Sequence, residues 1–195
     1  MDNTHEDSFQ YGKVYYFDKS GMPIDEHDAH TVHHGCKTFI ETCCRLHVPR
    51  GFKLAKCTPG MCFNLAGLTC LKNPIVQKVK LPACECEHPR KCDVVAGYEI
   101  RAVGDINFSV SIPIKPIRGY CFPKSSYVSS SATVPVNKVI SHTCCPKPCS
   151  CSEPCIDWTY SWFCASVVED ECGCYIQVKI GVVLEYTGSC ECDEE

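Results

Sequence analysis

Cysteine occupies 20 of the 195 positions of the chain, and the spacing of these cysteines restricts the chemistry that they can perform. Thiols at this density either bind a soft metal ion or become joined by disulfides. No two cysteines are separated by two residues, so the C-x-x-C motif is absent. Zinc ribbons, many iron–sulfur sites and thioredoxin-type redox sites use that motif to place two sulfurs in one tight turn. The spacing therefore argues against all of these classes.

Two other spacings recur instead, the C-x-C pair and the adjacent C-C pair. On an extended strand, residues i and i+2 project from the same face, so a C-x-C pair presents two thiols to one neighbour. Adjacent cysteines project to opposite faces, and each more readily joins a different partner. Both spacings are typical of a cross-linked network. The cross-linking candidates are Cys43, Cys44, Cys84, Cys86, Cys144, Cys145, Cys149, Cys151, Cys172, Cys174, Cys190 and Cys192.

Metal binding is the main competing interpretation. Cys84, Cys86, His88 and Cys92 could supply four ligands to zinc or copper, and the segment Cys144–Cys155 holds five sulfurs. Chains of the metallothionein type, which bind metal through C-x-C clusters, lack a hydrophobic core, whereas this chain has clear strand patterns. We therefore favour no metal site and expect no cofactor.

The histidines form a second cluster, near the N-terminus, at His27, His30, His33 and His34. Acidic residues are interleaved with them, and we interpret the segment as a polar arm in preference to a metal site. Hydrolase, metalloprotease, phosphate-binding and dinucleotide-binding motifs are all missing from the sequence. We expect no enzyme activity.

Length and charge narrow the class of protein further. A chain of 195 residues can bury roughly 70% of its unfolded surface, so it does not need disulfides in order to fold. The net charge of −4, without a basic block, argues against a nucleic-acid partner, and no apolar run is long enough to cross a membrane. The first residues are acidic and polar, unlike a secretory signal. Thiols that are made in a reducing compartment are expected either to hold metal or to be cross-linked later, once their surroundings become oxidising.

Two segments alternate strictly between polar and apolar residues, which predicts half-buried antiparallel strands. One runs from Tyr98 to Ile114, either as one strand or as a hairpin bent near Gly104-Asp105, and the other runs from Cys174 to Tyr186. No stretch carries a sustained helical stripe. We therefore predict an all-β sandwich or barrel of antiparallel strands with long cysteine-rich loops.

Weaker strand patterns occur at residues 75–81, 132–136 and 158–168. In the last of these, alternation predicts that Trp158, Tyr160 and Trp162 share one core-facing side. The serine-rich run Ser125–Ser131 is expected to be a hairpin loop.

The chain divides into three parts on composition. Residues 1–35 are predicted to be an N-terminal arm, flexible or ordered by a neighbouring subunit, in which Val14–Phe17 can form a short strand. Residues 36–192 form the cysteine-rich β-domain, and residues 193–195 form an acidic tail.

The order of strand-like segments in the second half resembles that of the SPOCS-type β-domain of bacterial spore coat and spore-assembly proteins. The likeness covers residues 75–188. It rests on the segments 75–81, 99–114, 132–140, 158–168 and 175–186. The cysteine content departs from this pattern, since many domains of the type have few cysteines.

With its cysteines, the chain more closely resembles the cysteine-rich outer-layer proteins (exosporium or coat) of clostridial spores. That resemblance implies a structural protein that is made in the mother-cell cytoplasm without a signal peptide and assembles on the spore surface. Its partners would be copies of itself and other spore-surface proteins, in a disulfide-linked lattice or fibre. Pairs such as Cys43/Cys44 and Cys190/Cys192 would then join subunits.

Three alternatives stay open on the sequence. They are an intracellular cysteine-rich metal-binding protein, a pilus-like subunit of a spore appendage, and a thiol redox enzyme. The missing C-x-x-C motif counts against the first and the last of these.

Overall fold

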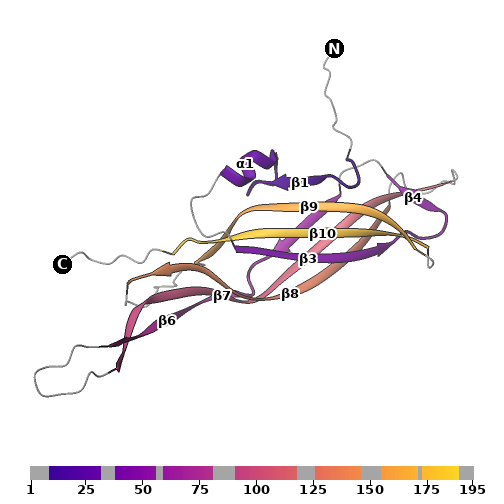
Figure 1. Ribbon diagram of the computed structural model, residues 1–195. Helices are drawn as coiled ribbons and strands as arrows, with labels where there is room; N and C mark the ends of the chain where they lie inside the picture. The colour runs from indigo at the N-terminus through magenta and orange to yellow at the C-terminus, as the bar shows by residue number, and fades with distance from the viewer. Residues whose placement is uncertain are drawn as a thin grey trace, which may run out of the picture.

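The computed structural model describes residues 9–31, 38–55, 59–80, 91–117, 126–145, 155–170 and 173–188. These residues form an all-β fold of antiparallel strands, as the sequence predicts (Figure 1). The elements are β1 (Val14–Phe17), β2 (Pro23–Ile24), α1 (Glu26–Thr31), β3 (Thr38–His47), β4 (Phe52–Leu54), β5 (Gly60–Asn64), β6 (Leu68–Lys80), β7 (Lys91–Pro116), β8 (Ser126–Thr143), β9 (Ile156–Asp170) and β10 (Gly173–Tyr186). Within these ranges, no helix is long and apolar enough to cross a membrane.

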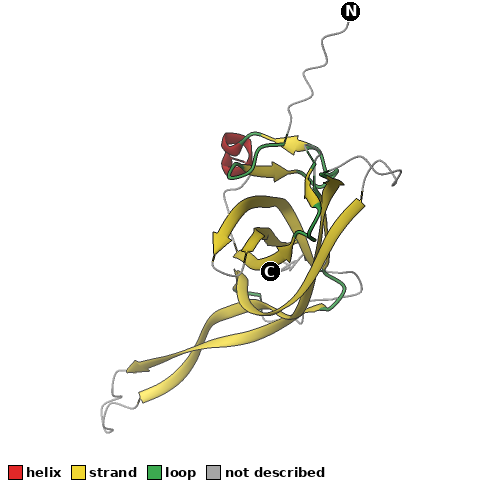
Figure 2. Ribbon diagram, turned by 90° about the vertical axis from the view of Figure 1, so that its right-hand side faces the viewer, coloured by secondary structure: helices red, strands yellow, loops and turns green. Residues whose placement is uncertain are grey.

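The strands make two antiparallel sheets. The first has the order β2-β1-β9-β10-β3. In the second, β8 lies along one side of the long central strand β7, while β4, β5 and β6 follow one another along its other side. Both sheets contribute to one core, and their edge strands β3 and β8 approach each other where the Thr38 hydroxyl donates to the Val139 carbonyl at 2.8 Å. Figure 2 shows the strands curving around this core.

The predicted alternation of β7 and β10 accounts for the centre of the core. The apolar even-numbered residues from Ile100 to Ile114 and from Ile176 to Leu184 are at most 3% exposed. Fully burying a Val, Leu, Ile or Phe side chain contributes about 1.5–3 kcal/mol. Side chains of both sheets therefore stabilise the fold through hydrophobic burial.

β7 is one continuous strand of 26 residues and does not bend back at Gly104. The chain turns on the opposite side instead, between β5 and β6, and Gly67 of that turn lies against Gly104. Gly104 has a φ of 134°, and a Cβ at this position would lie 2.0 Å from the Gly67 carbonyl oxygen. The glycine thus allows the turn to pack against β7, and of the two predicted alternatives the single strand is correct.

The prediction that the aromatic residues of β9 share one face is wrong. The pairing of β9 with β10 shifts register between Val182 and Leu184. A bulge of this kind adds a residue to one strand and reverses the alternation beyond it. Trp158 therefore packs on the main core, whereas Tyr160, only 1% exposed, belongs to a separate cluster against which Trp162 packs.

The chain itself orders much of the predicted N-terminal arm. β1 forms at Val14–Phe17 and pairs with both β2 and β9. α1 was not predicted from the sequence. Among its described residues only Ala29 belongs to the buried core, so the helix lacks the repeated apolar residues along one face by which a helix is recognised. The boundary proposed at residue 35 and the tail at 193–195 lie outside the described residues.

The serine-rich run is strand and not loop from Ser126 onward, while Ser125 lies outside the described residues. Residues 126–131 pair with β7 over the length from Ile114 to Ser109. The hydroxyls of Ser111 and Ser129 lie 2.9 Å apart on these neighbouring strands. Pairing with a long buried strand outweighs the weak strand preference of serine.

Candidate functional site

The adjacent pair Cys43/Cys44 lies on the edge strand β3, and its two thiols have opposite environments. Cys44 is 6% exposed and packs in the core, while Cys43 is exposed and forms no disulfide. Burial raises the pKa of the Cys44 thiol, a hydrogen bond with Ser130 partly offsets this, and Cys43 raises the pKa further. Only Cys43 of this pair can meet a thiol of another chain in the folded state.

Cys43 belongs to a row of side chains on the outer face of the first sheet. Lys179 of β10 pairs with Cys43 on one side and with Cys164 of β9 on the other. Two strand spacings separate the two cysteines, or about 10 Å, which is too far for a disulfide between them. The side-chain amide of Gln177 lies 3.3 Å from the Cys43 sulfur and donates to it. Both thiols therefore stay available on this face.

Cys144 and Cys145 follow the end of β8, and, like Cys43 and Cys44, one of the two is exposed and the other is buried. Cys144 is exposed, whereas Cys145 is 1% exposed. The Cys145 amide donates to the Thr143 hydroxyl at 3.1 Å, and its carbonyl accepts from the ammonium of Lys72. That ammonium also lies 4.6 Å from the centre of the Tyr98 ring. Hydrogen bonds of its backbone thus hold the buried Cys145 in place, whereas Cys144 lies at the surface.

Sequence reasoning missed Cys62, which the structure places at the surface. It lies on β5 between Met61 and Phe63, both of which pack against the core, and it pairs with Ser109 on the outer face of the second sheet. Cys62 also lines a cavity of about 560 Å³ beside the turn at residues 18–21. Its position between two apolar residues is a strand signal that could have indicated an outward thiol. It was overlooked because Cys62 belongs to neither a C-x-C nor a C-C pair.

Most of the other predicted cysteines lie outside the described residues. Cys92 and Cys174 pair through their backbones with Val79 and Glu169. Outside the described residues lie Cys84, Cys86, His88, Cys149, Cys151, Cys172, Cys190 and Cys192. The cross-linking role of all twelve candidates, and the metal site at Cys84, Cys86, His88 and Cys92, therefore stay predictions.

The described ranges bring together no group of three or more His, Cys, Asp or Glu side chains that could hold a metal ion. His27 lies on α1 with its side chain 85% exposed, and its Nδ1 is 3.7 Å from the Asp28 carboxylate. His33 and His34 lie outside those ranges, and the structure gives only the backbone of His30.

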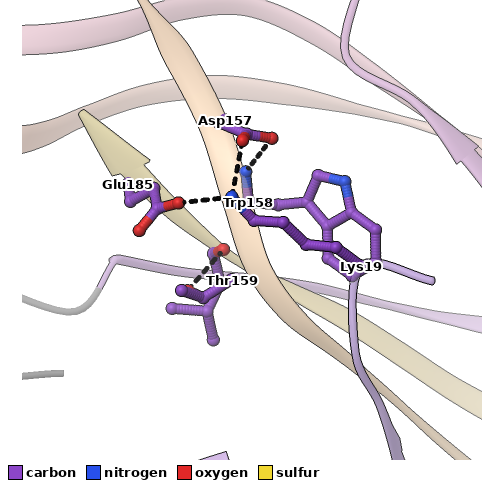
Figure 3. A network of polar contacts seen from close by, with 6 residues as sticks. Lys19, Asp157, Trp158, Thr159 and Glu185 are labelled. Atoms are coloured by element: carbon purple, nitrogen blue, oxygen red, sulfur yellow. Dashed lines mark hydrogen bonds and ion pairs between the residues drawn. The ribbon is translucent and has the colours of Figure 1, made fainter. Parts of the chain in front are cut away.

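Lys19 anchors the turn after β1 to the first sheet (Figure 3). Its ammonium lies 2.6 Å from the Asp157 carboxylate on β9 and 2.7 Å from the Glu185 carboxylate on β10. Burial raises the pKa of Asp157, but the hydrogen bonds from Lys19 and from the Trp158 amide outweigh it and hold that pKa below its usual value. These contacts fix the arm to the outer face that carries Cys43.

An apolar groove of about 620 Å³ opens between the arm and the neighbouring edge strands. It is lined by Val14, Tyr16, Phe39, Ile40, Glu41, Val134, Pro135, Lys138, Tyr160 and Trp162. Glu41 and Lys138 are the charged members of this set. The composition suits contact with another surface better than proton transfer or nucleophilic attack.

Comparison with known proteins yields one match. The family model of the YwhK N-terminal domain matches residues 31–158, which is more than half of the chain. This range begins at the end of α1 and stops near the start of β9. Neither a curated protein nor a solved structure matches the chain.

Proposed function

The chain belongs to the family of the YwhK N-terminal domain, and on that basis we propose that it is a structural, self-assembling protein of the bacterial spore surface whose chains are joined by disulfides. The family name is associated with sporulation in Bacillus. The likeness to cysteine-rich clostridial exosporium and coat proteins and to SPOCS-type domains supports the more specific assignment to the outer layers of the spore.

The observation that carries the proposal is the direction of the exposed thiols. Cys43 lies on the outer face of the first sheet and Cys62 on the outer face of the second. The two sheets contribute to a common core, and each of the two cysteines lies on the side of its sheet away from that core. One chain can therefore bond to two different neighbours, and repeated bonding produces an extended assembly instead of a closed dimer.

The chemistry is oxidation of paired thiols. Two thiols on neighbouring chains lose two protons and two electrons to form one disulfide, and dioxygen accepts them to give hydrogen peroxide. Such bonds persist in an oxidising environment and are rare in the cytosol. Synthesis in the mother-cell cytoplasm would keep the thiols reduced, and lysis of that cell would expose the assembled chains to air. The partners are then copies of the same chain, and the role requires no catalysis.

The proposal is tested with purified full-length protein that is reduced, then exposed to air, and analysed on denaturing gels with and without reductant. We expect a ladder of oligomers that collapses to monomer on reduction, together with the absence of bound metal by elemental analysis. The triple variant Cys43→Ser, Cys62→Ser, Cys144→Ser should form markedly shorter oligomers. Cys44→Ala, which removes a buried thiol, is the matched control and should leave the ladder intact.

A monomeric protein that carries several equivalents of metal and stays monomeric in air would overturn this proposal in favour of metal binding. A triple variant whose ladder equals that of the wild type would contradict the assignment of the bonds to the outward thiols.

A further inference from the structure

The outer parts of β6 and β7 extend beyond the other strands as a two-stranded ribbon (Figure 1). In this ribbon, Val76 pairs with Val95 and Lys78 with Asp93. A two-stranded hairpin is at best marginally stable in water, and at least a third strand or a packed surface is needed to stabilise it. The ribbon therefore has the properties of a surface that is completed by a partner.

Four valines of the ribbon are unusually exposed for strand residues. The exposed fractions are 54% for Val76, 40% for Val79, 43% for Val94 and 49% for Val95. Apolar side chains lie on both faces of the ribbon, because Val94 and Val95 are consecutive and project to opposite sides. A partner strand beside β7 would cover part of both faces at once.

β7 has an unpaired edge in this region. β8 pairs with β7 only as far as Tyr98, which lies opposite Thr143, the last residue of β8. From Lys91 to Gly97, no strand of the described chain pairs with β7 on the side away from β6. Edges of this kind are templates for pairing with another chain.

Val94 is the middle residue of the seven from Lys91 to Gly97; residues 91–95 pair with β6 in regular register, and Ala96 is an extra residue of β7 before Gly97. Paired antiparallel with its own copy, this edge would place Val94 beside Val94 and Asp93 beside Val95, so no like charges face each other across the contact. Each Gly97 would lie where β8 of its own chain begins to pair.

We propose that two copies of the chain pair antiparallel through residues 91–97 of β7, centred on Val94. The contact is isologous, and it creates a four-stranded sheet in the order β6-β7-β7-β6 across the two chains. This inference rests on the proposed self-assembly and names the non-covalent contact that joins chains before oxidation. Disulfides through Cys43 and Cys62 would then link such dimers to one another.

Sedimentation velocity of the full chain in the presence of reductant tests the pairing without any disulfide. We expect the wild type to dimerise reversibly. Val94→Lys and Val94→Asp should each raise the dimer dissociation constant by about tenfold or more, because each places two like charges side by side at the symmetry axis. Mixing the two variants should restore the dimer, since lysine then faces aspartate. Val167→Lys is the matched control, because Val167 of β9 is also 43% exposed and lies away from the ribbon.

A reduced wild type that is monomeric at all concentrations would overturn the pairing, and so would a Val94→Lys variant that dimerises as the wild type does. If such a monomer still forms a ladder in air, the proposed function holds while this contact is wrong. If the reduced chain dimerises as expected but air produces no disulfide-linked species, the pairing holds and the proposed cross-linking is wrong.

Discussion

Burial and thiolate formation together set the reactivity of each cysteine in this protein. The thiolate is the reactive form, and it is disfavoured wherever a thiol is removed from water. Cys44 is buried and the pKa of its thiol is raised by that burial, whereas Cys43, one residue away, lies at the surface. Cys145 and Cys144 show the same contrast in burial. Each adjacent pair thus offers one reactive thiol and one that serves the core as a small apolar side chain.

Alkylation of the reduced, folded protein should distinguish the two groups. We expect iodoacetamide to modify Cys43, Cys62 and Cys144 about tenfold faster or more than Cys44 and Cys145. Peptide mass spectrometry at successive times measures the rates, and the same experiment in urea is the control, because unfolding should make all the rates similar. Equal rates at Cys43 and Cys44 in the folded protein would contradict the placement of β3.

The adjacent spacing predicted that neighbouring cysteines on a strand face opposite ways, and the burial of Cys43 and Cys44 on β3 agrees with it, while Cys144 and Cys145, beyond the end of β8, show the same contrast in burial. The sequence could not tell which member is buried, because that depends on the strand across the core. β3 itself was missed for a related reason. Its inward residues include Ile40, Cys44 and Leu46, and the alternation is visible only when Cys44 is counted as apolar. Cys62 was missed because it is a single cysteine.

At the scale of elements, the alternation of polar and apolar residues predicts the long strands, whereas tertiary contacts determine where those strands become irregular. β7 and β10 bury the residues that period-two alternation selects. Neither the bulge between Val182 and Leu184 nor the packing at Gly104 has a comparable sequence pattern, because each depends on a segment distant in the chain. Because of the bulge, the side chains of Tyr160 and Trp162 point to the opposite face of the sheet from Trp158. There they form part of the surface on which the arm packs.

Gly104→Ala should destabilise the fold by more than about 2 kcal/mol, since its Cβ would collide with the backbone of the turn and its φ is unfavourable for alanine. Urea denaturation of reduced protein measures the change in the free energy of unfolding. Gly60→Ala is the control, because a Cβ there would meet its nearest atom only at 3.9 Å, and we expect a change of less than about 1 kcal/mol. Equal losses in the two variants would contradict the close approach at Gly104.

At the scale of the whole molecule, the segment that matches the family is shorter than the unit that folds together. The match ends at residue 158, yet β3, which lies inside it, pairs with β10, which lies outside it. β9 and β10 also carry the partners that hold the arm, Asp157 and Glu185, of which only Asp157 falls within the match. We infer that the matched segment needs the last two strands to bury its own edge strand. The face that carries Cys43 thus depends on a strand outside the match, whereas Cys62 lies on β5, which pairs with β7 inside it.

The central claim is that outward thiols on the two sheets join different chains, and isotope mixing tests it most directly. Reduced ¹⁴N and ¹⁵N chains are mixed in equal amounts, oxidised together in air, and digested without reduction for mass spectrometry. We predict disulfide-linked peptides of mixed label that contain Cys43 or Cys62. If every disulfide at these two cysteines joins peptides of the same label, the bonds lie within single chains and the claim is contradicted.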